Sequence, residues 1–93
     1  AVQRDAPRLD ALVSNAGIWH NDAPRRTSAD GHELHLAVNF LAGHALTRAL
    51  LPLLRRSAPA RIVNVASAAQ TPIDFDDPML TRGYGGMRAY AQS

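Results

Sequence analysis

"LDALVSNAG", from Leu9 to Gly17, is a short apolar run that ends in a turn signal. A run of this length, bounded by turn residues, is typical of a strand that is buried in a sheet. We expect this strand to span Leu9–Ser14. A second apolar run, Arg61–Ala66, ends in the same way at Ser67 and predicts a second buried strand.

The segment between the two strands, residues 28–56, carries the three- and four-residue period of a helix. Ser28 or Asp30 is expected to cap this helix, and Glu33 to lie in its first turn, where the helix dipole favours a negative charge. A second apolar face is expected to pack against another subunit or another segment of the protein. Its members are Leu36, Phe40, Leu46, Leu50 and Leu54.

Loops are predicted at 17–28 and 68–85, and "GMRAYAQS" at the end of the sequence opens a further helix. Strands that alternate with helices pair in parallel through right-handed crossovers. The sequence therefore predicts an α/β fold, a Rossmann-like parallel sheet fragment in the order strand, helix, strand, helix, incomplete at both ends. In such sheets ligands bind beyond the carboxyl ends of the strands, so functional residues are expected after Ser14 and after Ala66.

The composition, with 46% hydrophobic and 19% charged residues, is that of a chain that folds. No cysteine is present, which excludes a disulfide scaffold and thiolate metal sites, and we expect a reducing, cytoplasmic location. All ten basic residues are arginine and no run of them exceeds two, so no nucleic-acid partner is expected. No uninterrupted apolar run reaches the ~18 residues of a membrane span, so no span is expected.

The four histidines do not predict a metal site. His32 and His35 are three residues apart at the start of the predicted helix, with Glu33 between them. Spacing positions no third ligand, so we expect a solvated helix face and no bound metal.

Small and polar residues follow both strands. After the first strand, Gly17 permits a turn that a side chain would block, and Ala16 lets a flat ligand approach, although a plain strand-to-loop turn would need the same residues. After the second strand, the hydroxyl of Ser67 can donate to a substrate oxygen or satisfy a backbone group of the following loop.

One amide and two phenols are further candidates. Asn39 lies in an otherwise apolar helix, where its amide can cap a neighbouring loop or hold a water in a proton path. A phenol, with a pKa of about 10, needs a nearby cation to act as an acid near neutrality. At four positions along a helix, that cation would be Arg88 for Tyr84 and the residue after Ser93 for Tyr90.

Together these motifs resemble the short-chain dehydrogenase/reductase family, in particular its retinol-dehydrogenase-like branch. The family motif N-N-A-G appears as "SNAG", its helix motif as "AVNFLAG", its strand-to-serine motif as "RIVNVASAA", and its Tyr-x-x-x-Lys begins at Tyr90 in "AYAQS". Ser14 replaces the first asparagine of N-N-A-G. The glycine-rich T-G-x-x-x-G-x-G loop is not among these residues, and the lysine would follow Ser93.

The resemblance implies that residues 1–93 are the central part of a single dinucleotide-binding oxidoreductase domain. Such an enzyme moves a hydride between NAD or NADP and a small carbonyl or alcohol substrate. Tyr90 would be the general acid or base, Ser67 would orient the substrate oxygen, and Asn39 would hold a proton-relaying water. The cofactor-binding residues would be Asn15, Ala16, Gly17 and Tyr90.

The same resemblance implies that Tyr84 lies in the loop beside the substrate cleft and that the long helix pairs with its copy in a homo-oligomer. Two other functions remain open. A non-catalytic nucleotide-binding or scaffolding relative of the fold would not need a charged residue after Ser93. A self-contained interaction domain would fold cooperatively by itself, which we do not expect for a sheet and helix without their covers.

Overall fold

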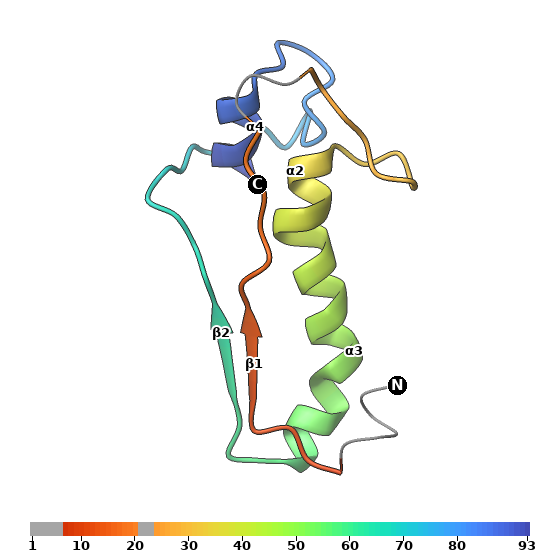
Figure 1. Ribbon diagram of the computed structural model, residues 1–93, viewed down its shortest axis with the longest axis vertical. Coiled ribbons are helices and arrows are strands. Elements are labelled where there is room, and N and C mark those ends of the chain that lie inside the picture. Colours follow the sequence, from red (N-terminus) through yellow and green to blue (C-terminus); the bar gives the residue numbers. More distant parts are fainter. Residues whose placement is uncertain (1–6, 21–23) are drawn as a thin grey trace.

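The computed structural model describes residues 7–20 and 24–93 of the chain. Two strands and a long helical segment run along the length of the molecule, and a short helix lies beyond the carboxyl ends of the strands (Figure 1). The predicted order of strand, helix, strand, helix is confirmed. Positions 21–23 of the predicted loop at 17–28 lie outside the described residues.

The strands are β1, Ala11–Ser14, and β2, Arg61–Asn64, and they pair in parallel with their first residues opposite each other. Backbone bonds of 3.0 Å close the two ends of the ladder, from the Arg61 amide to Asp10 and from the Val65 amide to Ser14. Each strand is two residues shorter than predicted, because the two segments of the chain are not paired beyond these bonds.

Three contiguous parts make up the long helical segment: α2, Leu34–Leu36, the π-helical turn η1, Ala37–Leu41, and α3, Ala42–Arg56. The α3 part packs on β1. A π turn inserts an extra residue into the helical ladder and is common at functional sites. Here it contains Asn39, only five residues after the start of the helix, or about 7.5 Å along its axis.

The predicted start of this helix, capped by Ser28 or Asp30, is wrong. The preceding residues form a turn that is closed by an antiparallel bridge between Thr27 and Glu33. Glu33 is the N-cap, and its carboxylate accepts bonds from the amides two and three residues further on, at 3.0 and 2.8 Å. Glu33, which we expected in the first turn of the helix, is therefore the residue just before that turn.

The last helix, α4, spans Gly86–Gln92, as the sequence predicts. The loop before it is tied to the helix by Gln92, whose side chain accepts a bond from the Asp74 amide (3.1 Å) and donates one to the Pro78 carbonyl (3.3 Å). Contacts between α4 and α2 hold the short helix beyond the carboxyl ends of both strands (Figure 1).

The apolar core of the described residues is small. Its buried members are Leu50, Leu53, Leu54, Leu80 and Ala89. Every residue of β2 is exposed, although strands of parallel sheets are normally covered on both faces. The accessible surface is 6517 Å², against about 5,200 Å² for a compact monomer of this mass. The radius of gyration is 15.4 Å, against roughly 12 Å for a compact domain of this length.

The predicted second apolar face of the long helix is only partly buried. Leu50 and Leu54 are covered, whereas Phe40 and Leu46 are 48% and 47% exposed. The segment Leu34–Arg56 has the length and, with a mean hydropathy of 1.3, the composition of a membrane span, although it lacks the uninterrupted run that we looked for. Helices that cover a sheet in water meet the same two criteria, so the absence of a span stays a prediction.

We predict that the 93-residue chain alone does not fold cooperatively, because its strands and its long helix expose apolar surface that no other described residue covers. Thermal unfolding of the isolated peptide, followed by circular dichroism, should give a broad, gradual change. A sharp two-state transition would contradict this prediction and favour the self-contained interaction domain.

Candidate active site

A groove of about 950 Å³ opens at the carboxyl ends of the strands and continues along α3. All six residues that the sequence singled out as a site line this groove. They are Asn15, Ala16, Gly17, Asn39, Ser67 and Tyr90. These residues come from four separate segments, namely the loop after β1, the π turn, the loop after β2 and α4. The fold therefore brings the predicted cofactor-binding and catalytic residues to one edge of the sheet.

Neither backbone conformation nor close packing requires a glycine at position 17. Its φ lies outside the left-handed region, so the turn that we expected a side chain to block is open to other residues. A Cβ at this position would lie 3.4 Å from the Oδ1 atom of Asn39. This distance is an ordinary van der Waals contact, so a small side chain at this position is compatible with the bonds that Asn39 makes to the loop.

The side chain of Asn39 caps that loop, which is one of the two alternatives left open by the sequence. Its Oδ1 atom accepts a bond from the Ile18 amide (2.7 Å), and its Nδ2 atom donates to the Ile18 carbonyl (3.0 Å). The second Nδ2 hydrogen goes to the hydroxyl of Ser93 (2.9 Å). One amide thus joins the loop after β1, the helix and the end of α4.

Ser67 makes the loop contact that we considered, but as an acceptor. Its Oγ atom accepts a bond from the Ala69 amide (3.1 Å). The hydroxyl hydrogen has no acceptor among residues 7–20 and 24–93. Ser67 can therefore satisfy the loop and still donate into the groove.

Tyr90 lies in a smaller pocket of about 140 Å³ together with Ser67. The other residues of its wall are Trp19, Ala69 and Met87. Within the described part of the chain the Tyr90 hydroxyl has no hydrogen-bond partner. Its ring meets the ring of Trp19 edge to face, with centroids 5.8 Å apart and planes at 61°. The two hydroxyls that the family pattern calls for thus face one pocket.

Tyr84, the competing tyrosine, belongs to a different cluster. Its hydroxyl donates to the carboxylate of Glu33 (3.1 Å) rather than lining either cavity. Burial raises the pKa of Tyr84 above its ordinary value, and the negative charge and hydrogen bond of Glu33 raise it further. A phenol with a raised pKa is a poor proton donor near neutrality, so the geometry favours Tyr90. Arg88, the cation that we considered for Tyr84, bonds the Gly83 carbonyl instead (3.0 Å).

The prediction of a solvated histidine face is wrong for His35. This side chain is 2% exposed, and its Nδ1 atom bonds Glu33 at 2.9 Å. Its Nε2 atom accepts a bond from the His20 amide (3.0 Å), so the ring is neutral and carries its proton on Nδ1. Periodicity misplaced His35 because the helix begins six residues later than Ser28. Among the described residues no group of three potential ligands could hold a metal ion.

Comparison with known proteins agrees with this geometry. The sequence model described as "short chain dehydrogenase" matches residues 1–74. The chain belongs to the short-chain dehydrogenase family. It is 44% identical to retinol dehydrogenase 13 of Homo sapiens over 99% of its length, and 48% identical to human retinol dehydrogenase 11 over 91%. The retinol-dehydrogenase-like branch is therefore confirmed.

One solved structure that is similar to this chain has the same fold. A crystal structure of an uncharacterized protein from Mycobacterium paratuberculosis superposes with a TM-score of 0.76 and 33% identity, over 97% of this chain and 32% of that one. The chain spans about 28% of retinol dehydrogenase 13 and 27% of retinol dehydrogenase 11. A match to about a quarter of the relatives' length is consistent with the apolar surface that is exposed on the strands and on the long helix.

Sequence reasoning missed three residues of this short-chain dehydrogenase site. Trp19 was read only as part of a loop, Ser93 as the last residue of a helix, and His35 as a surface residue. Trp19 and Ser93 carried no signal that spacing could reveal, because their partners are more than fifty residues away. His35 could have been found, since a histidine two residues after a capping glutamate can reach its carboxylate.

The Glu33 cap predicts a pH-dependent stability. Burial by itself raises the pKa of Glu33, but the hydrogen bonds from the Leu36 and His35 amides and from the His35 ring outweigh it and lower the pKa below 4.5. A lowered folded-state pKa means that the stabilisation is complete above the unfolded pKa and is lost as the pH falls through the folded one. In the intact protein, Glu33→Gln should lower the free energy of unfolding by about 2 kcal/mol at pH 7.

Below about pH 4 that difference between wild type and variant should shrink, since protonation then removes the same carboxylate. Urea unfolding at several pH values measures it. Asp30→Asn, which changes an exposed carboxylate in the same turn, should have little effect at any pH. A Glu33→Gln difference that stays constant down to pH 3 would contradict the proposed role of the charge.

Proposed function

We propose that the intact protein is an NAD(P)-dependent oxidoreductase that transfers a hydride between a nicotinamide cofactor and a carbonyl or alcohol substrate. The observation that supports this most is the convergence of Asn39, Ser67 and Tyr90 on one groove at the carboxyl edge of a parallel sheet. Ligands bind at this edge in open α/β folds. Retinol dehydrogenases are similar to this chain over 91–99% of its length, which supports a carbonyl or alcohol as substrate.

The wall after β1 fits a nicotinamide cofactor. Asn15, Ala16 and Gly17 are exposed and line the groove. The methyl group of Ala16 and the absence of a side chain at Gly17 let a flat group approach the backbone. Ser14, beside them, holds a buried Oγ atom that has no partner among the described residues. The cofactor would be held by this wall and by Tyr90, and when bound it supplies the hydride chemistry.

In this proposal Tyr90 moves the proton. Its unpaired hydroxyl donates to the substrate oxygen in the direction of reduction and takes the proton back in oxidation. A phenol needs a cation to do this near neutral pH, and the position after Ser93 lies one helical turn beyond Tyr90, on the same face. A lysine there would lower the pKa of the phenol.

Ser67 orients the substrate. Its Oγ atom accepts a bond from the Ala69 amide through a lone pair, so the hydroxyl hydrogen is still available to donate to the substrate oxygen beside Tyr90. Two donors to one oxygen would stabilise the negative charge that develops on it during reduction.

Asn39 has a positioning role and can also serve a proton path. Both hydrogens of its amide nitrogen are used, but from residues 7–20 and 24–93 Oδ1 accepts one bond, which leaves it a second lone pair. A water held by that lone pair would stand near Ser93, and thus near the expected lysine. Such a water would distinguish Asn39 from an asparagine that only caps a loop.

Replacement of the Tyr90 hydroxyl tests the proposed function. In the intact protein, Tyr90→Phe should lower kcat by 10²–10⁴-fold, the usual contribution of general acid catalysis, while NADH or NADPH still binds. Oxidation or reduction of the cofactor with a panel of aldehydes and alcohols measures turnover, and calorimetry measures binding. Tyr84→Phe is the matched control and should keep its kcat.

Two outcomes would go against the proposal. If Tyr90→Phe turned over as fast as wild type, Tyr90 would not be the acid. If wild type bound NADH or NADPH but converted none of the substrates, the non-catalytic nucleotide-binding or scaffolding relative would be the better description.

A further inference from the structure

We propose that His35 is a positioning residue for the proton-donating tyrosine. It holds the backbone of His20, and thereby the neighbouring Trp19, whose ring contacts Tyr90. This inference rests on the proposed oxidoreductase function and adds to it a residue that acts from outside the site, since His35 lines neither cavity.

The orientation of the Tyr90 ring depends on Trp19. Within residues 7–20 and 24–93 the phenol hydroxyl has no hydrogen-bond partner, so no polar contact from these residues fixes the ring. The ring meets the indole edge to face, with centroids 5.8 Å apart and planes at 61°. Because aromatic pairs prefer such a geometry, the contact restricts how the phenol can turn. Trp19 therefore helps to keep the hydroxyl of Tyr90 facing the pocket that it shares with Ser67.

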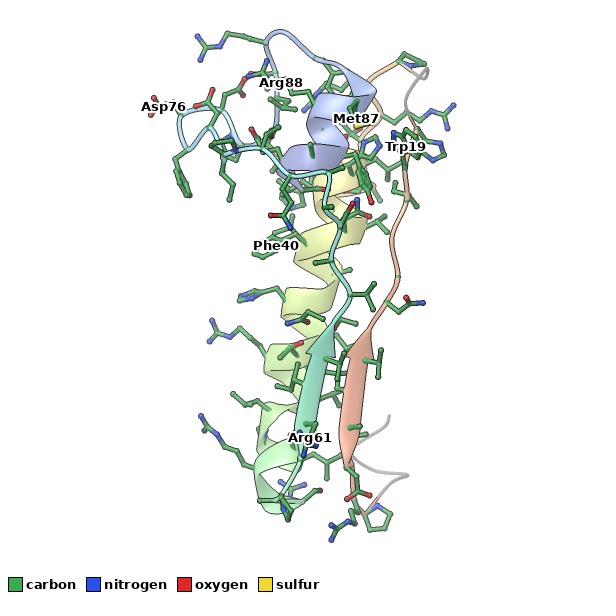
Figure 2. All side chains as sticks on the ribbon, turned by 90° about the vertical axis from the view of Figure 1, so that its left-hand side faces the viewer. Trp19, Phe40, Arg61, Asp76, Met87 and Arg88 are labelled. Atoms are coloured by element: carbon green, nitrogen blue, oxygen red, sulfur yellow. The ribbon has the colours of Figure 1, made fainter. Side chains whose placement is uncertain are left out.

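Burial does not hold Trp19 in place. This residue is 55% exposed and lies at the end of the molecule that carries α4 (Figure 2). Hydrogen bonds instead fix the backbone on both sides of it. The amide and carbonyl of Ile18 bind the side chain of Asn39 at 2.7 and 3.0 Å, and the amide of His20 donates to Nε2 of His35 at 3.0 Å. Loss of the second connection would free the loop directly after the indole.

The surroundings of His35 make its Nε2 atom an acceptor. The ring is buried, and its Nδ1 atom bonds the carboxylate of Glu33 at 2.9 Å. That carboxylate also accepts bonds from the amides of His35 and Leu36 and from the hydroxyl of Tyr84. A carboxylate with this many donors is ionised and can only accept, so Nδ1 carries the proton and Nε2 keeps its lone pair for the His20 amide.

Two variants that each keep one ring nitrogen's function test this role in the intact protein. The amide group of glutamine reaches the position of Nε2, whereas that of asparagine reaches only the position of Nδ1. His35→Gln therefore keeps an acceptor for the His20 amide, and His35→Asn loses it. We expect His35→Asn to lower kcat by about tenfold, because a small displacement of a reacting group has a large effect on rate. His35→Gln should keep most of the wild-type kcat.

The KM for NADH or NADPH should change little in His35→Asn, because Asn39 still holds the loop next to the proposed cofactor-binding residues. His32→Asn is the matched control. It makes the same chemical change one turn earlier, at a histidine that lines neither cavity, and should leave kcat unchanged. A His35→Gln variant that lost as much kcat as His35→Asn would overturn the inference.

A double-mutant cycle shows whether His35 acts through the indole. Trp19→Ala should itself lower kcat, and His35→Asn should then cause little further loss. The same fold loss from His35→Asn in the presence and in the absence of the indole would overturn the inference, because His35 would then only support the fold.

NMR separates this inference from the proposed function. If wild type converted no substrate, the proposed function would be at fault, and His35 would be judged from the ring signals of Tyr90 in protein with labelled tyrosine, assigned by their loss in Tyr90→Phe. His35→Asn should move these signals toward their position in Trp19→Ala, and His35→Gln should not. Unchanged signals in His35→Asn would overturn the inference.

One measurement on wild type does not depend on whether the His35 variants fold. Hydrogen exchange at the His20 amide should be slow, because the amide donates to a buried ring nitrogen. Fast exchange of this amide would overturn the inference, since the connection from His35 to the loop would be absent.

Discussion

The amide of Asn39 is the constraint on which the site depends. Through Oδ1 and Nδ2 it binds both backbone polar groups of Ile18, and through its remaining hydrogen it binds Ser93. Loss of either partner would leave polar groups unsatisfied in a half-buried place, at a cost of about 1–3 kcal/mol for each. These bonds fix the loop after β1 and the end of α4 relative to the helix between them.

The other features of the groove follow from this connection. The loop is bonded to Asn39 at Ile18, and its path beyond Ile18 carries Trp19 to the ring of Tyr90. A second, independent cluster, in which Glu33 caps the helix and binds His35, holds the next residue of the loop. The bonds made by Asn39 and by His35 therefore determine where the exposed ring of Trp19 lies.

Much of the fold was predictable from local patterns. The apolar runs at Leu9–Ser14 and Arg61–Ala66 gave both strands, and the α/β order then placed their carboxyl ends at one edge, as the structure confirms. The start of the long helix was not predictable in this way, because a bridge between Thr27 and Glu33 overrides the capping preference of Ser28 and Asp30. That interaction depends on tertiary packing, which a helical period does not report.

Six candidate site residues were predicted from the sequence, and all six line the groove. Five of them are polar or small residues at strand ends or within an apolar helix, whereas Tyr90 was chosen over Tyr84 through the family resemblance. Their roles in catalysis and in cofactor binding stay predictions. Trp19 could not be found, because nothing in its neighbours' identity indicates a contact with a residue so far along the chain. The same is true of the bond between Asn39 and Ser93.

Hydrogen exchange at the Ile18 amide in the intact protein tests the central role of Asn39 most directly. The account predicts that this amide exchanges slowly in wild type, because it donates to Oδ1 of Asn39, and that Asn39→Ala speeds its exchange while the Val65 amide, bonded to Ser14, stays protected. Fast exchange of the Ile18 amide in wild type, or the same rate in Asn39→Ala, would contradict it.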